Sequence, residues 1–143
     1  MKLTIYSDGA SRNNPGHAGL GVVIKDGQKI VAEIAEYLGK TTNNIAEYMA
    51  FIRGLEEALA LGAKEVHCYA DSELLVKQIN GEYRVKHEGL VPLYHHATAL
   101  KKKFKEFDLD YIPREQNKAA DALSNKAIDD HHASTHGPLF GTI

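Results

Sequence analysis

The spacing of apolar residues changes at Thr42, and this change restricts the possible folds more than any other feature of the sequence. Before it, residues 2–8 (KLTIYSD) alternate in the manner of a strand, and residues 18–39 predict two more strands joined by the Asp26–Gly27 turn. A long helix capped by Thr42 and ended by Gly62 is expected next. Its apolar residues recur at the spacing of one helix face: Ile45, Met49, Ile52, Leu55 and Leu59.

The rest of the chain alternates between strands and helices. Strands are predicted at residues 65–71 and 109–113, and helices at residues 72–80, 90–107 and 118–129. We therefore expect an α/β fold with a five-stranded mixed sheet flanked by helices. The first three strands form an antiparallel meander in this prediction, and strands 4 and 5 follow them.

The length of 143 residues suits one domain with its own core. We assign residues 1–129 to this domain and residues 130–143 to a C-terminal tail that is flexible or packed on the surface. Three histidines lie close together in this tail and could bind a transition metal: His131, His132 and His136.

Charge and cysteine content narrow the functional classes. The chain has 17 lysines and arginines against 19 acidic residues, a formal net charge of -2, and so lacks the basic surplus typical of proteins that bind nucleic acid mainly through charge. The single cysteine, Cys68, excludes an internal disulfide, and the sequence shows neither a signal peptide nor a long apolar span. We expect a cytoplasmic monomer with no membrane contact.

Two acidic residues follow predicted strands. Asp8 ends the first strand and Asp71 ends the fourth. Strands separated by helices usually run parallel, so these two strand ends are expected side by side at one edge of the sheet. Two carboxylates in such a place repel each other unless a cation neutralises them.

Two further acids lie beside apolar helix faces. Glu47 is near the start of the long helix, and Asp121 lies between Ala120 and Ala122 in the last helix. Taken singly, an aspartate at a strand end forms a turn and an acid in a first helical turn complements the helix dipole. Taken together, four carboxylates suit Mg²⁺ or Mn²⁺ as ligands, and not zinc.

Four short motifs resemble those of the type 1 ribonuclease H family, in the same order and spacing. They are YSDGASRNNPG from residue 6, TNNIAEYMA from 42, YADSELLVKQ from 69 and NKAADALS from 117. The resemblance covers residues 2–129. It implies the ribonuclease H-like fold and hydrolysis of the RNA strand of RNA/DNA hybrids with two Mg²⁺ or Mn²⁺ ions, leaving 5′-phosphate and 3′-hydroxyl ends. The implied metal-binding and catalytic acids are Asp8, Glu47, Asp71 and Asp121.

The loop before the last helix departs from the family pattern. It reads IPREQNKAAD and has no histidine where many relatives carry one, which leaves Arg114 or Glu115 for that position. Arg114 could stabilise charge on a phosphate, which makes it a candidate catalytic residue, or it could simply pair with a nearby acid. Glu115 could attract a metal or guide product release.

Amide side chains near the predicted acids are candidates for substrate binding. An RNA strand differs from DNA by its 2′-hydroxyl, which the implied hybrid partner presents in the minor groove. Candidates to contact the hybrid are Asn13, Asn14, Thr42, Asn43 and Asn44, although a tight turn and a helix cap also explain these residues. A catalytically weak hybrid-binding module, or one that depends on a partner, is the alternative function, and the presence of all four acids favours the enzyme.

Overall fold

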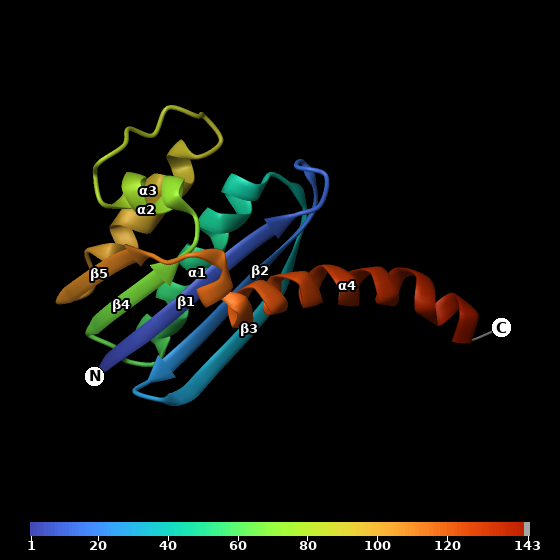
Figure 1. Cartoon of the computed structure of the whole chain (residues 1–143), viewed down its shortest axis with the longest axis horizontal. Coiled ribbons are helices and arrows are strands. Elements are labelled where there is room, and N and C mark those ends of the chain that lie inside the picture. Colours follow the sequence, from blue (N-terminus) through green and yellow to red (C-terminus); the bar gives the residue numbers. More distant parts are fainter. Residues whose placement is uncertain (142–143) are drawn as a thin grey trace.

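The computed structural model describes residues 1–141 and the side chains of residues 1–134 (Figure 1). The strands are β1 Lys2–Ser11, β2 Gly16–Asp26, β3 Lys29–Thr41, β4 Glu65–Ala70 and β5 Glu106–Tyr111. The helices are α1 Asn43–Ala60, α2 Glu73–Ile79, α3 Val91–Lys101 and α4 Lys118–Gly141, with a 3-10 turn at Arg114–Gln116.

The strands form one mixed sheet in the order β3-β2-β1-β4-β5. β1, β2 and β3 pair antiparallel, whereas β4 runs parallel to β1 and β5 runs parallel to β4. The predicted fold class, with its meander of three strands, is therefore confirmed. β1 lies at the centre of this sheet, so residues near its carboxyl end are held by neighbours on both sides.

Helices cover both faces of the sheet (Figure 1). On one face α1 buries Tyr48, Phe51 and Leu55, and α3 packs against α1 to extend this core. On the other face α4 crosses β2 closely, because a methyl group at Gly21 would lie 2.0 Å from the Ala120 carbonyl oxygen. Both α1 and α4 are thereby brought against β1.

The end of α3 differs from the prediction. The apolar residues Leu100, Phe104 and Phe107 have helical spacing, and the sequence therefore predicts a helix as far as residue 107. The helix instead ends at Lys101, and Phe104 is buried from the turn that follows. Phe107 belongs to β5 and reaches the core edge-on against Phe51, at a ring distance of 6.0 Å.

The last helix begins at Lys118 as predicted but continues past the predicted end at Asp129. The ring of His131 stacks on Tyr37 of β3 at a centroid distance of 3.6 Å, which packs this part of α4 on the sheet. The side chain of His136 lies outside the described residues. A metal site in the tail and the division of the chain after residue 129 therefore stay predictions.

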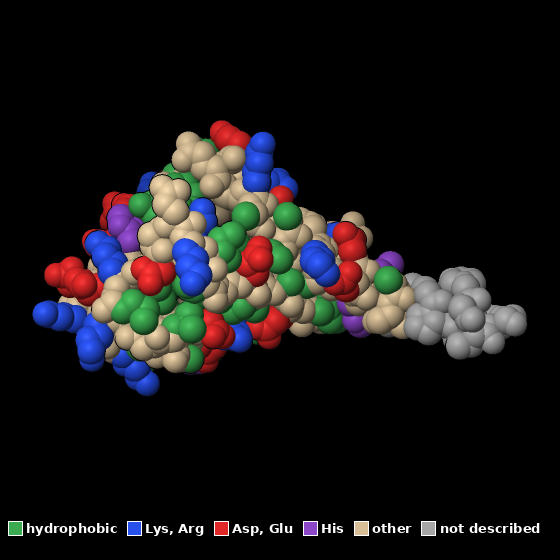
Figure 2. Space-filling view, turned by 90° about the horizontal axis from the view of Figure 1, so that it is seen from below, with side chains coloured by type: hydrophobic (Ala, Val, Ile, Leu, Met, Phe, Trp, Pro, Cys, Tyr) green, Lys and Arg blue, Asp and Glu red, His purple; other side chains and the backbone are tan. Residues whose placement is uncertain are grey.

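The surface of the described residues carries mixed charge. Figure 2 shows lysine, arginine, aspartate and glutamate side chains interspersed over one face. This mixture agrees with the nearly balanced composition. No helix within residues 1–141 is both long and apolar enough to cross a membrane.

Candidate active site

Asp8 of β1 lies beside the point where β4 ends. The parallel β1–β4 ladder ends at the pair Ser7 and Ala70, and Asp8 and Asp71 are the residues that follow this pair along the chain. The prediction that these acids lie at one edge is confirmed. The prediction that Asp8 ends its strand is wrong, because β1 continues to Ser11 along β2. β1 thus loses its neighbour only on the β4 side, and this opens the space beside Asp8.

Glu47 reaches the same space from α1, which begins at the predicted cap: the Thr42 hydroxyl accepts a hydrogen bond from the Ile45 amide. Gly9 of β1 allows α1 to come close, because a methyl group there would lie 2.2 Å from the Ala46 carbonyl carbon. The Gly9 amide donates to Glu47 Oε1 at 2.6 Å and fixes the carboxylate.

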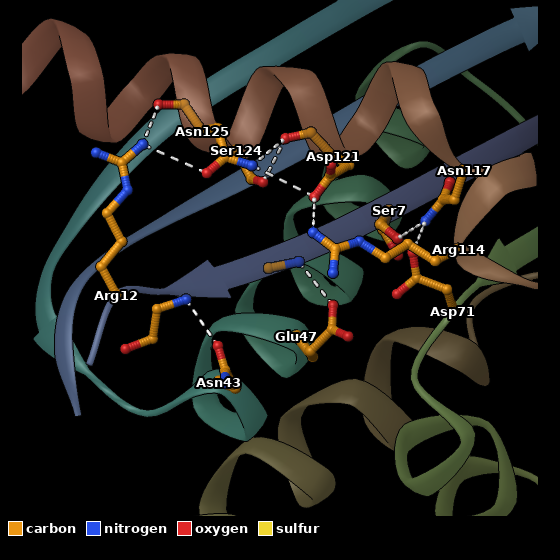
Figure 3. A network of polar contacts seen from close by, with 12 residues as sticks. Ser7, Arg12, Asn43, Glu47, Asp71, Arg114, Asn117, Asp121, Ser124 and Asn125 are labelled. Atoms are coloured by element: carbon orange, nitrogen blue, oxygen red, sulfur yellow. Dashed lines mark hydrogen bonds and ion pairs between the residues drawn. The ribbon is translucent and has the colours of Figure 1, made fainter. Parts of the chain in front are cut away.

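Three carboxylates therefore form a compact group. Asp8, Glu47 and Asp71 each offer an oxygen that lies within 4.8 Å of the other two. Asp8 and Glu47 are almost completely buried. The group lines a cleft of about 410 Å³. Figure 3 shows two of its members, Glu47 and Asp71, beside β1. The other lining residues are Gly9, Ala10, Ser11, Arg12, Asn43, Arg114, Asp121 and Asn125.

Burial and like charge disfavour ionising all of these carboxylates together. Burial, followed by the charges of Glu47 and Asp71, raises the pKa of Asp8 far above its ordinary value. Burial also raises the pKa of Glu47 and of Asp71, although hydrogen bonds from Gly9 and Asn117 respectively oppose it. A divalent cation would relieve this repulsion, and an all-carboxylate donor set suits Mg²⁺ or Mn²⁺. The residues present therefore fit such an ion.

Asp121 faces the group from the first turn of α4. It lies close enough to Asp8 for a hydrogen bond between the two to contribute to the raised pKa of Asp8. Asn125 Nδ2 donates to Asp121 Oδ1 at 3.3 Å, and Arg114 Nη2 lies 3.7 Å from the same oxygen. All four predicted acids thus lie in one cleft.

Of the two candidates for the position of the missing histidine, Arg114 lines the cleft. Its side chain is 78% exposed, so its guanidinium remains accessible while it pairs with Asp121. Glu115 is also exposed but is not among the lining residues. The structure therefore separates two neighbours that the sequence leaves equivalent.

Two of the amide side chains predicted to bind substrate connect the end of β1 and the loop after it to the start of α1 through hydrogen bonds. Asn43 lines the acidic cleft and its Oδ1 accepts the Ser11 amide at 2.7 Å. Asn14 Oδ1 in turn accepts the Asn43 amide at 2.9 Å. Asn13 is exposed, with a positive φ of 68° in the same loop.

A second hollow lies beside the acidic cleft. Its volume is about 230 Å³, and its lining residues are Asn14, Thr42, Asn44, His87 and Leu90. Three of the five predicted substrate-binding residues line this second hollow: Asn14, Thr42 and Asn44. Asn43 lines the acidic cleft instead, and Asn13 lines neither space.

Arg12, Asn117 and Asn125 contact the site but have no role in the sequence-based predictions. Arg12 lines the cleft, forms an ion pair with Asp129 at 2.8 Å and donates to Asn125 Oδ1 at 3.4 Å. Asn117 is buried and donates to Asp71 Oδ2 at 3.1 Å. Their motifs are visible in the sequence, but these contacts join residues that are up to 113 positions apart, which local spacing does not reveal.

Comparison with known proteins agrees with this geometry. Residues 6–127 match a family model described as reverse transcriptase-like. The chain is 44% identical over 131 residues to a bifunctional protein of Mycobacterium tuberculosis, covering 90% of this chain and 36% of that protein. It is 40% identical over 130 residues to ribonuclease HI of Halobacterium salinarum, covering 90% and 65%. The chain thus spans less than two thirds of the length of both relatives.

Solved structures match over nearly their full length. The crystal structure of ribonuclease H1 from Halobacterium salinarum superposes with a TM-score of 0.88 at 39% identity, covering 91% of this chain and 99% of that one. The structure of LC11-RNase H1 in complex with an RNA/DNA hybrid gives a TM-score of 0.86 at 42% identity, covering 90% and 98%. The family model matches residues 6–127 of the chain and these structures are matched almost entirely, so the chain belongs to the type 1 ribonuclease H family.

Proposed function

We propose that this protein hydrolyses the RNA strand of RNA/DNA hybrids. The observation that carries the proposal is the group of three carboxylates within 4.8 Å at the end of the β1–β4 ladder. LC11-RNase H1, which shares the fold and 42% of its residues, has been solved with such a hybrid. The ligands for two divalent cations, Mg²⁺ or Mn²⁺, are Asp8, Glu47, Asp71 and Asp121.

The reaction is a displacement at phosphorus. A water oxygen forms a bond to the phosphorus, the bond to the 3′ oxygen breaks, and the departing oxygen takes up a proton, which leaves 5′-phosphate and 3′-hydroxyl ends. When bound, the two cations supply an activated water and neutralise charge on the phosphate and on the leaving oxygen. The chain contributes the carboxylates, which accept hydrogen bonds from the Gly9 amide, Asn117 and Asn125.

Arg114 contacts the phosphate in this proposal. Its guanidinium lies at the rim of the cleft and is exposed, so it can move from Asp121 to a phosphate oxygen at little cost. It thereby supplies positive charge where many relatives carry a histidine.

The amides bind the hybrid beside the reacting phosphate. Asn43 Oδ1 is used by the Ser11 amide, so its Nδ2 group is the part directed to an RNA 2′-hydroxyl. Asn13, Asn14 and Asn44 contact the minor groove, and Thr42 contacts a phosphate of the DNA strand near the second hollow.

The test is cleavage of a hybrid labelled on the RNA or on the DNA strand, with Mg²⁺, Mn²⁺ or EDTA. We expect metal-dependent cutting of the RNA strand alone, with 5′-phosphate on the downstream product. Duplex DNA and duplex RNA are the comparison substrates. Asp8→Asn should slow cutting by on the order of a thousandfold, and Asp108→Asn, which changes an exposed acid on β5, should leave the rate unchanged. Cutting in EDTA, or an Asp8→Asn variant that cuts about as fast as the wild type, would refute the proposal.

A further inference from the structure

Asn117 stands out among the buried polar residues outside the four acids. It is 2% exposed and immediately precedes α4. Its Nδ2 donates to the Ser7 carbonyl at 2.9 Å and to Asp71 Oδ2 at 3.1 Å. Its backbone carbonyl accepts the Asp121 amide at 3.1 Å. One residue therefore joins β1, the end of β4 and the start of α4 (Figure 3).

The orientation of the Asn117 amide group is fixed by these contacts. Ser7 O and Asp71 Oδ2 are both acceptors, so an oxygen in place of Nδ2 would face two oxygens and no donor. Asn117 Oδ1 consequently points the other way. Among the described side chains it is the buried polar atom without a hydrogen-bond partner. A buried unpaired oxygen is unfavourable, which suggests that the amide is retained for what its nitrogen does.

The position of the Asn117 nitrogen explains that role. Ser7 and Ala70 form the last pair of the β1–β4 ladder, and beyond it β4 no longer holds Asp71 to β1. The amide spans this point, because it bonds a main-chain atom of β1 and the carboxylate of Asp71 together. Asp71 is only half-buried and would otherwise have several side-chain rotamers.

We propose that Asn117 is a positioning residue that orients the Asp71 carboxylate for binding a divalent cation. It acts through Asp71, and the inference rests on the proposed function only for the identity of that cation. Removing the amide leaves Asp71 free to rotate away from Asp8 and Glu47. The affinity for the cation then falls, even with no nucleic acid present.

The experiment measures Mn²⁺ binding to the whole chain by calorimetry, without substrate. Asn117→Ala is expected to weaken Mn²⁺ binding by roughly 10-fold to 100-fold. Ile128→Val, a buried change in α4 away from the cleft, controls for lost stability and should leave Mn²⁺ affinity unchanged.

A double-mutant cycle separates positioning from a general structural role. If Asn117 acts through Asp71, Asn117→Ala should have little further effect on Mn²⁺ affinity once Asp71→Asn is present. Equal effects of Asn117→Ala in both backgrounds would overturn the inference, as would unchanged affinity in the folded Asn117→Ala protein. A wild type that binds Mn²⁺ but does not cut hybrids would instead overturn the proposed function alone.

Discussion

The repulsion among the buried carboxylates predicts that Asp8→Asn stabilises the metal-free protein. Two unit charges 4.8 Å apart, the upper limit in this group, repel by about 3 kcal/mol at an effective dielectric constant of about 20. Asp8 faces both Glu47 and Asp71, but proton uptake relieves part of that repulsion in the wild type. We therefore expect a gain of about 3 kcal/mol at pH 8, or about 10 °C in Tm for a chain of this size.

The gain should depend on pH in a defined direction. The pKa values of Asp8 and Glu47 are raised by folding, so the folded protein keeps protons that the unfolded chain releases above about pH 4. The stability of the metal-free wild type thus falls as pH rises, by about 1.4 kcal/mol per pH unit for each retained proton. Asp8→Asn removes one such group, and its advantage should be smaller at pH 5 than at pH 8.

Thermal and urea unfolding in EDTA at pH 5 and pH 8 would measure this difference. Asp108→Asn, on the exposed side of β5, should leave the stability nearly unchanged. Saturating Mg²⁺ should narrow the gap between the wild type and Asp8→Asn, because the wild type gains stability by binding the ion. A metal-free Asp8→Asn protein that is no more stable than the wild type at pH 8 would refute the reasoning.

Three further changes follow from single contacts. Gly9→Ala should destabilise the protein by about 3 kcal/mol or more in urea unfolding, since its methyl group would meet the α1 main chain; a loss below about 1 kcal/mol would contradict this. Arg114→Ala should leave Tm nearly unchanged but lower kcat/KM on a hybrid by about 10-fold or more, with partial recovery in Arg114→Lys; equal rates would exclude a role for the guanidinium. His131→Ala should cost about 1 kcal/mol and speed hydrogen exchange after residue 129, whereas unchanged exchange would show that stacking on Tyr37 does not hold α4.

Local sequence patterns were sufficient to predict most of the fold. The change of period at Thr42 correctly placed α1 and its cap, and the glycines at 27 and 62 have the positive φ values expected of a turn and a helix end. Ser72 caps α2, which lies within the range predicted for it. These features depend on a few neighbouring residues, which is why the sequence alone revealed them.

The errors arose where distant parts of the chain decide the structure. Phe104 and Phe107 continue a helical spacing, but pairing of β5 with β4 draws Phe107 into a strand. The polar composition after Asp129 predicts that the helix ends there. In the structure α4 continues, and His131 stacks on Tyr37 of β3. The alternating stretch of residues 2–8 ends in an acid and so predicts a strand end at Asp8, whereas pairing with β2 extends β1 to Ser11.

The four acids of the candidate site could be predicted from the sequence. Parallel pairing of β1 and β4 brought Asp8 and Asp71 together, as strand order implies. The residues that hold the acids were not predictable, since the Asn117–Ser7 contact joins positions 110 residues apart. A motif shows which carboxylates are present, but only the folded chain shows what orients them.

The most direct test of the account measures hybrid binding and hybrid cleavage side by side, in the wild type and in Asp8→Asn with Mg²⁺. We predict that both proteins bind the hybrid with affinities within a few-fold of each other, while the variant cuts the RNA strand slower by on the order of a thousandfold. A wild type that binds the hybrid and leaves both strands intact with Mg²⁺ and with Mn²⁺ would contradict the account and indicate a binding module or a protein that needs a partner.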